Sequence, residues 1–173
     1  MNVSLVLTII GADKPALVDA IASVVSSHEG NWLESRLMRL GGQFAGILRI
    51  ELPSEKEKEF MAAVPSLDKQ GLSVSVHRDT EGAQSRTNLK ALTLVIVGQD
   101  RPGIVRQISR ALAENGANVE EFESECISAA MSGETLFQAR VLASVTQEQD
   151  LTKLQTDLEK IAADLMVEVS FES

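Results

Sequence analysis

Gly98-Gln99-Asp100-Arg101-Pro102-Gly103-Ile104-Val105 is the second of two similar segments in this chain, and Gly11-Ala12-Asp13-Lys14-Pro15-Ala16-Leu17-Val18 is the first. The two segments lie 87 residues apart in a chain of 173 residues. In both, an apolar run typical of a strand comes before the segment, and an apolar stripe with helical spacing comes after it. The pattern therefore predicts a strand-to-helix turn that is made twice, in a chain that is an internal repeat.

The residue types in this turn suit the start of a helix. A short carboxylate accepts a hydrogen bond from the free N–H groups of the first helical turn, so Asp13 and Asp100 are predicted N-caps. The proline that follows each aspartate suits the first turn, where a missing N–H costs nothing. Gly103 lets the backbone come close to whatever lies above the turn, whereas the first copy has Ala16 at this position.

The first half of the chain has the pattern strand, helix, strand, strand, helix, strand. The predicted elements are a strand at 3–10, a helix from 16 to a glycine stop at 30, strands at 32–40 and 44–52 around a Gly41-Gly42 turn, a helix at 55–67 and a strand at 72–76. The apolar character of 3–10 indicates a strand that is covered on both faces or central in a sheet.

The second half repeats this order. Its predicted elements are a strand at 92–97, a helix from 104 to a glycine stop at 116, strands at 119–127 and 136–145, a helix at 151–165 and a strand at 167–171. Aligning Gly42 with Gly133 gives the second hairpin four extra residues. The polar stretch before the second half predicts a domain at 1–78, a linker at 79–90 and a second domain at 91–173.

Two βαββαβ units of about 80 residues predict an α+β protein made of two ferredoxin-like modules. Right-handed crossovers place both helices of each module on one face of a four-stranded antiparallel sheet. The opposite face needs a cover, so the modules are expected to pair with each other and the chain to form a homodimer.

Composition excludes several classes of protein. The net charge is −9 and aromatic residues make up 3% of the chain, so no direct binding to nucleic acid is expected. The apolar run 3–10 is too short to cross a membrane. The single cysteine, Cys126, allows neither an internal disulfide nor a cysteine-based metal site, and we expect it to be buried or half-buried, with its thiolate disfavoured by Glu123 and Glu125. A cytoplasmic location follows as the expectation.

Catalytic groups are scarce. His28 and His77 each lie alone in the sequence, and no hydrolase, zinc or phosphate-binding motif is present. We therefore expect no enzyme activity, no catalytic residue, no cofactor and no bound metal. One alternative on the same fold is a hydrolase of the acylphosphatase type, for which Arg101 would have to hold a phosphate.

The repeated turn is the remaining candidate for a binding site. The N–H groups at a helix start suit a carboxylate, Asp13 or Asp100 suits an ammonium group, and Asn31 and Asn118 both donate and accept hydrogen bonds. A free amino acid needs carboxylate and ammonium recognition together. The same residues also have a purely structural interpretation, as caps, helix starters and a residue after a glycine stop, and spacing alone favours that interpretation.

The segment from Gly98 to Val105, followed by Gly116-Ala117-Asn118-Val119, resembles the opening of an ACT domain, and the first half resembles another. The tandem pair covers nearly the whole chain. It is most similar to the glycine cleavage system transcriptional repressors, which are stand-alone double-ACT proteins. Gly11-Ala12-Asp13-Lys14-Pro15 and Ser35-Arg36-Leu37-Met38-Arg39-Leu40-Gly41-Gly42-Gln43-Phe44 are similar to their first domain.

This resemblance implies a sensor of small ligands, often amino acids, at interfaces between ACT domains. Carried over by position, the ligand contacts fall on Asp13, Asn31, Asp100, Gly103 and Asn118. The subfamily implies repression without contact to DNA, through a DNA-binding activator protein as partner. The hypothesis is therefore an amino-acid-sensing regulator, with glycine suspected as ligand. The alternative is a regulatory, feedback-inhibition subunit of an amino-acid metabolic enzyme.

Overall fold

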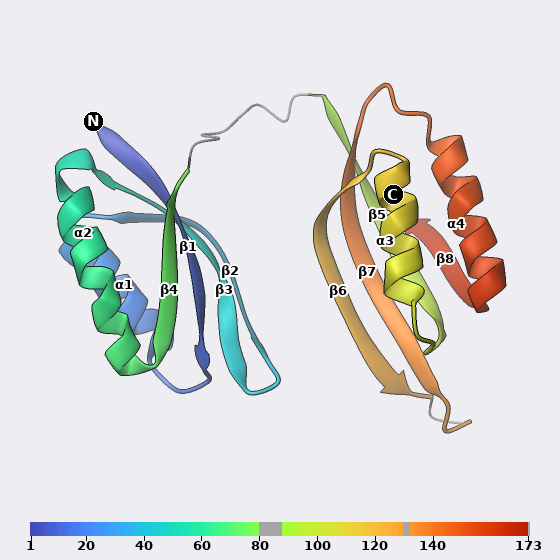
Figure 1. Ribbon diagram of the computed structural model, residues 1–173, viewed down its shortest axis with the longest axis horizontal. Coiled ribbons are helices and arrows are strands. Elements are labelled where there is room, and N and C mark those ends of the chain that lie inside the picture. The colour runs from blue at the N-terminus through green and yellow to red at the C-terminus, as the bar shows by residue number, and fades with distance from the viewer. Residues whose placement is uncertain (80–87, 130–131, 173) are drawn as a thin grey trace. The chain divides into compact units, whose positions relative to one another are not determined.

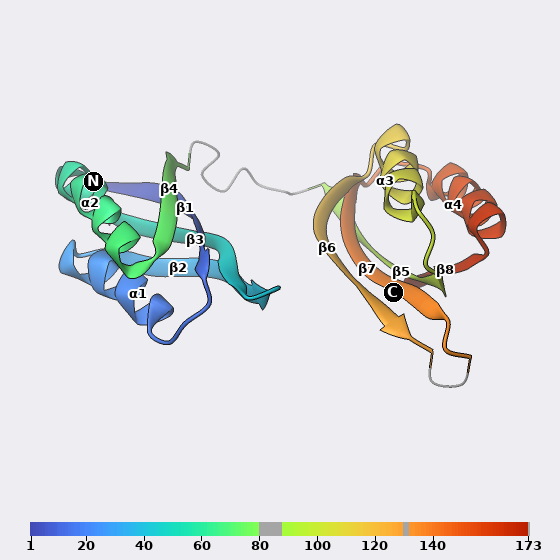
Figure 2. The ribbon, with the colours of Figure 1, turned by 60° about the horizontal axis from the view of Figure 1, so that its bottom comes forward.

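The computed structural model of the chain describes residues 1–79, 88–129 and 132–172. The chain separates into two compact units, Met1–Gln84 and Ser85–Ser173. Figure 1 draws the first from blue to green and the second from yellow-green to red. Each unit has one four-stranded antiparallel sheet, and Figure 2 shows the helices of each unit on a single face of its sheet. The predicted α+β fold with two ferredoxin-like modules is confirmed.

Unit 1 has its strands in the order β2-β3-β1-β4 across the sheet. Its elements are β1 (Asn2–Ala12), α1 (Leu17–Ser27), β2 (Asn31–Leu40), β3 (Gln43–Pro53), the 3-10 turn η1 (Ser54–Lys56), α2 (Glu57–Ala63), the 3-10 segment η2 (Val64–Gln70) and β4 (Leu72–Arg78).

Unit 2 has the equivalent strand order, β6-β7-β5-β8. Its elements are β5 (Leu89–Gln99), α3 (Ile104–Glu114), β6 (Asn118–Ser128), β7 (Thr135–Thr146), α4 (Leu151–Leu165) and β8 (Val167–Glu172). Figures 1 and 2 both show α3 and α4 side by side over the sheet.

The first strand of each unit is central in its sheet, as the apolar run 3–10 predicted. In β1, Leu5, Leu7 and Ile9 are buried against the helices, whereas Thr8 and Ile10 on the other face are exposed. Each buried aliphatic side chain contributes about 1.5–3 kcal/mol by leaving water. Each unit has a separate apolar core of this kind.

The helix predicted at 55–67 is broken. The α-helical part, α2, ends at Ala63, and η2 continues it in the tighter 3-10 form with Pro65 near its start. Proline has no N–H to donate to the carbonyl four residues earlier, and its ring clashes with that carbonyl. A change to 3-10 geometry is a common outcome at such a position.

The predicted N-caps are also wrong. The N-cap residues are Ala16 and Gly103, both in the left-handed conformation and without a side-chain cap. Asp13 and Asp100 lie three residues earlier, where their N–H groups donate to the carbonyl oxygens of Gly42 (2.9 Å) and Thr135 (3.0 Å). The aspartates therefore end the first strands rather than begin the helices, and the prolines precede the caps.

Strand register also corrects the alignment of the two hairpins. Val6 pairs with Arg49 in unit 1, and Thr93, which is 87 residues after Val6, pairs with Leu142 in unit 2. The third strands are therefore offset by 93 residues, so the second hairpin has six extra residues, not four. Sequence alignment placed the glycines of the two turns together, but backbone pairing sets the true correspondence.

Most of the linker predicted at 79–90, namely residues 80–87, lies outside the described residues. Asp79 belongs to the hydrogen-bonded structure of unit 1, since its N–H donates to the Ser4 carbonyl at 2.9 Å. Leu89 and Lys90 are already part of β5.

Candidate functional site

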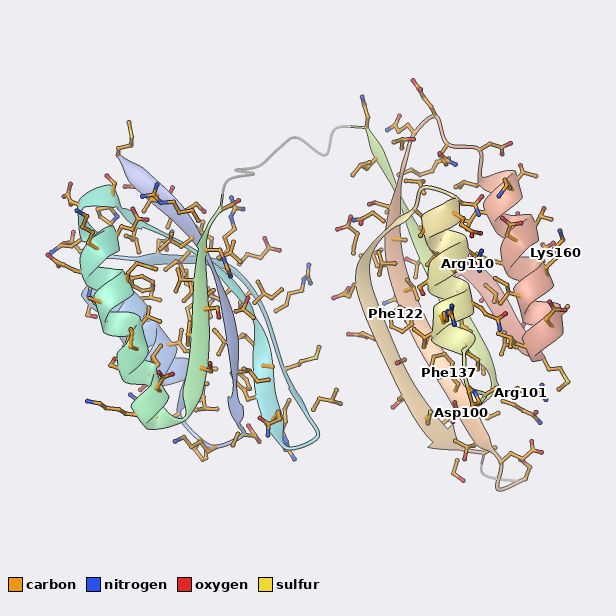
Figure 3. All side chains as sticks on the ribbon, in the orientation of Figure 1. Asp100, Arg101, Arg110, Phe122, Phe137 and Lys160 are labelled. Atoms are coloured by element: carbon orange, nitrogen blue, oxygen red, sulfur yellow. The ribbon has the colours of Figure 1, made fainter. Side chains whose placement is uncertain are left out.

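An open pocket of about 520 Å³ lies at the start of α3 in unit 2. Its lining combines the β5–α3 loop, the first turns of α3 and one aromatic ring of β7. The lining residues are Asp100, Arg101, Gly103, Ile104, Val105, Arg106, Ser109 and Phe137. Figure 3 shows Asp100 and Arg101 below the first turn of α3, with Phe137 nearby. We call this concavity the loop pocket.

The loop holds its shape through backbone contacts. The Asp100 N–H donates to the Thr135 carbonyl, and the Gln107 N–H donates to the Gly103 carbonyl at 3.0 Å. Gly103 has φ 94°, which only glycine adopts without strain. This left-handed residue turns the chain from the end of β5 into α3. As a result, the side chains of the loop and of the first helical turns border one concavity.

The charges around the loop pocket are mixed. Asp100 is exposed, and Arg101 donates from Nη2 to the Gln99 side-chain oxygen at 3.2 Å. The Arg106 guanidinium has no hydrogen bond or ion pair with another described residue, although the Arg106 carbonyl accepts a hydrogen bond from Ser109 Oγ at 3.2 Å. One carboxylate and two guanidinium groups thus border the same space, which suits a small zwitterion.

Cys126 lies beside this loop and is exposed, contrary to the expectation of a buried thiol. It sits on β6, an edge strand, so one side of it has no covering strand. Partial desolvation raises the pKa of the Cys126 thiol, and the negative charge of the nearby Asp100 carboxylate raises this pKa further. The thiolate is therefore disfavoured, as predicted. The carboxylate responsible is Asp100 rather than Glu123 or Glu125.

In the equivalent loop of unit 1, the aspartate carboxylate is neutralised by an ion pair. Asp13 is ion-paired with Arg39 at 3.2 Å, and Ala16 occupies the N-cap position with φ 69°. Arg39 and Cys126 are equivalent positions, because each pairs across the sheet with a phenylalanine of the third strand, Phe44 or Phe137.

Asn31 and Asn118 lie at the opposite end of each sheet from the aspartates. Asn118 pairs with Ser144, whereas Gln99 next to Asp100 pairs with Leu136, eight residues away along β7. At about 3.3 Å per residue, roughly 26 Å of strand separate them. Asn118 donates instead to the Glu120 carboxylate at 3.0 Å.

Unit 1 has the same arrangement. Asn31 pairs with Glu51, whereas the Asp13 N–H donates to Gly42 at the far end of β3. The structure thus brings Asp100 and Gly103 together, but neither asparagine lies near the loop of its own unit.

Arg106, Ser109 and Phe137 line the loop pocket but lie outside the repeated segment from which the site was predicted. Comparison of the two halves offers one signal for them. Arg106 stands where the first half has Asp19, and Ser109 where it has Ala22, at the 87-residue offset. Phe137 carried no such signal, because its role depends on the register of β7.

A second concavity, of about 490 Å³, lies between α3 and α4. Its charged residues are mostly paired with each other, since Arg110 binds Glu114 at 2.7 Å and Lys153 binds Asp157 at 2.9 Å. Figure 3 shows Arg110 and Lys160 on these two helices, away from Asp100. These ion pairs lie between neighbouring turns of each helix and support the helices themselves.

Within the described residues, no group of three or more His, Cys, Asp or Glu side chains is placed to hold a metal ion. No helix in the described part of the chain is long and apolar enough to cross a membrane.

Comparison with known proteins matches both units to one family. A model of the ACT domain matches residues 4–77 and again residues 90–172. A UPF0237 protein of Methanocaldococcus jannaschii is 32% identical over 82 residues, which are 47% of this chain and 84% of that protein.

Two solved structures match over the whole chain. An unknown protein from Galdieria sulphuraria superposes with a TM-score of 0.84 and 25% identity, covering 99% of this chain and 98% of that one. A candidate glycine cleavage system transcriptional repressor superposes with a TM-score of 0.73 and 18% identity, covering 99% and 97%. At that identity, the second likeness establishes a shared fold.

Proposed function

The chain belongs to the ACT-domain family, and we propose that it is a regulatory protein that binds a free amino acid in the loop pocket and represses transcription through a protein partner. ACT domains are regulatory domains that bind small molecules, which agrees with the resemblance found in the sequence. The observation that supports this function most is the convergence of Asp100, Arg101 and Arg106 on one concavity.

The chemistry of the loop pocket matches the two charged ends of an amino acid. The Asp100 carboxylate would accept hydrogen bonds from the ligand ammonium group, and an arginine fork would bind the ligand carboxylate. Gly103 keeps the loop backbone free of a side chain where the ligand approaches. We do not propose acyl phosphate hydrolysis, because the loop has no glycine-rich phosphate cradle around Arg101.

Asn118 would then contact a ligand bound to a different module. It lies roughly 26 Å of strand from Asp100 in its own unit, so a site that uses both residues needs a second module beside the first. We propose that Asn31 would serve in the same way, whereas Asp13, which is already paired with Arg39, would contribute little to ligand affinity, and that the chain acts as a homodimer.

Repression through a protein rather than through DNA agrees with the net charge of −9. The three glutamates of β6 at positions 121, 123 and 125 share the face of the sheet that points away from the helices. Arg140 lies opposite Glu123 on this face, so the excess of carboxylates is two. Such a face suits a basic surface, and the DNA-contacting surface of an activator is basic. The structurally similar repressor candidate names the glycine cleavage system as the target to test.

The test is calorimetric titration of the full chain with glycine, serine and the remaining amino acids. We expect saturable binding by the wild type, a loss of at least about tenfold in affinity for Asp100→Asn, and nearly unchanged affinity for the matched Asp13→Asn. Absence of binding by any amino acid at several millimolar would refute the sensor. Equal loss in both variants would refute the assignment to unit 2.

Co-purification separates this function from the alternative of a feedback-inhibition subunit. Recovery of a DNA-binding activator supports the repressor, and recovery of a catalytic subunit of amino-acid metabolism supports the alternative.

A further inference from the structure

We propose that the loop pocket selects an acidic amino acid, such as glutamate or aspartate, over glycine. This inference rests on the proposed function, because it assumes that the loop pocket is where a free amino acid binds. It adds the class of ligand, which neither the fold nor the family specifies.

The loop pocket has one more positively charged group than the binding of glycine requires. Asp100 suits the ammonium group and one guanidinium suits the α-carboxylate. The lining contains two arginines, Arg101 and Arg106. Arg101 uses one terminal nitrogen on Gln99, which leaves further donors of its five N–H groups. The Arg106 guanidinium has no partner among the described residues, so a second anion would be the group that satisfies it.

The size and lining of the loop pocket agree with a ligand that has a side chain. Its volume of about 520 Å³ falls within the range of roughly 300–1,000 Å³ for small-molecule sites. Ile104, Val105 and Phe137 supply apolar surface next to the arginines. The methylene groups of an acidic side chain can cover this surface while the terminal carboxylate reaches a guanidinium. Glycine has no side chain and leaves the surface open to water.

Unit 1 provides an internal contrast. The position of Arg106 is Asp19 there, and the Asp13 carboxylate is already paired with Arg39. A ligand with a second carboxylate would meet the Asp19 carboxylate instead of a guanidinium, and like charges repel at this range. The selective site is therefore in unit 2, and we expect one acidic ligand for each chain.

The experiment is calorimetric titration of the full chain with L-glutamate and L-aspartate, compared with their neutral amides and with glycine. The proteins are the wild type, Arg106→Gln and the control Arg110→Gln. Arg110 is an exposed arginine of the same helix that does not line the loop pocket and is paired with Glu114. Circular dichroism checks that each variant is folded.

We expect an acidic amino acid to bind the wild type at least about tenfold more tightly than its amide, which is the typical effect of one charge-assisted hydrogen bond. Arg106→Gln should reduce this ratio to within about threefold, and Arg110→Gln should leave it intact.

Three outcomes would overturn the inference. If glycine or the amides bind the wild type as tightly as the acidic amino acids or more tightly, selectivity for an acidic ligand is refuted. The proposed function is then not affected. If Arg106→Gln keeps the selectivity of the wild type, the assignment of selectivity to Arg106 is refuted. Failure of every amino acid to bind removes both the inference and the proposed function.

Discussion

Asp13 and Asp100 occupy the same position in the two units, but the first is ion-paired with Arg39 at 3.2 Å and the second lies beside the Cys126 thiol. One difference on the second strand of each unit, arginine in β2 and cysteine in β6, therefore decides whether the carboxylate is ion-paired. Two loops with the same aspartate and proline can thus differ in charge because of a residue outside the loop. This difference is why we propose unit 2 as the binding unit.

The ends of the first helices differ in the same way. His28 caps α1, its Nδ1 lies 2.7 Å from the Val24 carbonyl oxygen, and its ring meets Phe60 edge-on with the ring centres 5.7 Å apart. Asn115, the equivalent residue of α3, is buried and donates to the Ala111 carbonyl and to the Asp157 carboxylate, both at 2.9 Å. In unit 1, the end of α1 contacts α2 through an aromatic pair. In unit 2, the end of α3 contacts α4 through hydrogen bonds.

The largest expected effect concerns a feature that the units share. A Cβ on Gly98 would lie 2.6 Å from the Val167 Cα, and one on Gly11 would lie 3.2 Å from the Gly71 carbonyl carbon and closer to its oxygen. Backbone atoms cannot move aside cheaply, so Gly98→Ala and Gly11→Ala should each lower the free energy of unfolding by about 3 kcal/mol. Urea unfolding by circular dichroism measures both losses.

Tryptophan fluorescence separates the units in this experiment. Trp32 is the only tryptophan of the chain and packs against the core of unit 1, so its transition should shift with Gly11→Ala and remain in place with Gly98→Ala. Gly133→Ala is the control, since a Cβ there meets no atom within 4 Å and faces only the cost of φ 70°. Losses no greater than that of the control would contradict the close approach in both units.

The next effect concerns the hydrogen bonds between Asn115 and α4 in unit 2. Asn115→Ala removes three hydrogen bonds of a buried side chain, two that it donates and one that it accepts from Lys153, and we expect it to cost about 2 kcal/mol of unfolding free energy. His28→Ala should cost about 1 kcal/mol through loss of its ring contact. Equal costs, measured by the same urea titration, would show that the two contacts are energetically interchangeable.

A smaller effect is expected from exchanging the residues at the loop caps. Gly103→Ala places a side chain at φ 94° and should cost about 1 kcal/mol, although space for the Cβ is available. Ala16→Gly relieves the strain at φ 69° but adds freedom to the unfolded chain, so its net gain should be about 0.5 kcal/mol. Effects of the same sign in the two variants would contradict this account.

The smallest effect concerns the thiol. Because the Asp100 carboxylate raises the pKa of Cys126, Asp100→Asn should lower that pKa toward its usual value, with the part due to desolvation remaining. The thiolate fraction at pH 8 then increases, and alkylation by iodoacetamide should become about two- to threefold faster. Cys126 is the only cysteine, so the rate is unambiguous. An unchanged alkylation rate, or an equal increase in Asp13→Asn, would contradict an effect of the Asp100 carboxylate on the pKa of Cys126.

Most of the fold was predictable from the sequence because local patterns report local structure. Alternating and helical spacing predicted all eight strands and the central place of the first strand in each sheet. The errors occurred where geometry depends on more than the pattern. Pro65 ended α2 although the apolar spacing continued, and the aspartates paired with hairpin carbonyls instead of capping helices.

The candidate site was predictable only in part. The loop residues Asp100 and Gly103 were named from the repeat, and they do border one pocket. Asn118 was expected with them, because both follow or precede α3 in sequence. It lies at the other end of the sheet because a strand that leaves the end of a helix starts one helix length away from the helix start.

The sequence by itself determined that this chain is a repeat of two βαββαβ modules, because a duplicated pattern of apolar spacing and turn residues specifies the same elements twice. Only the tertiary structure decided that Asp13 meets Arg39 while Asp100 meets Cys126, and that Phe137 borders the loop pocket. Those contacts depend on which residues lie opposite each other across neighbouring strands. Register arises from the pairing of whole strands, and no single segment of sequence encodes it.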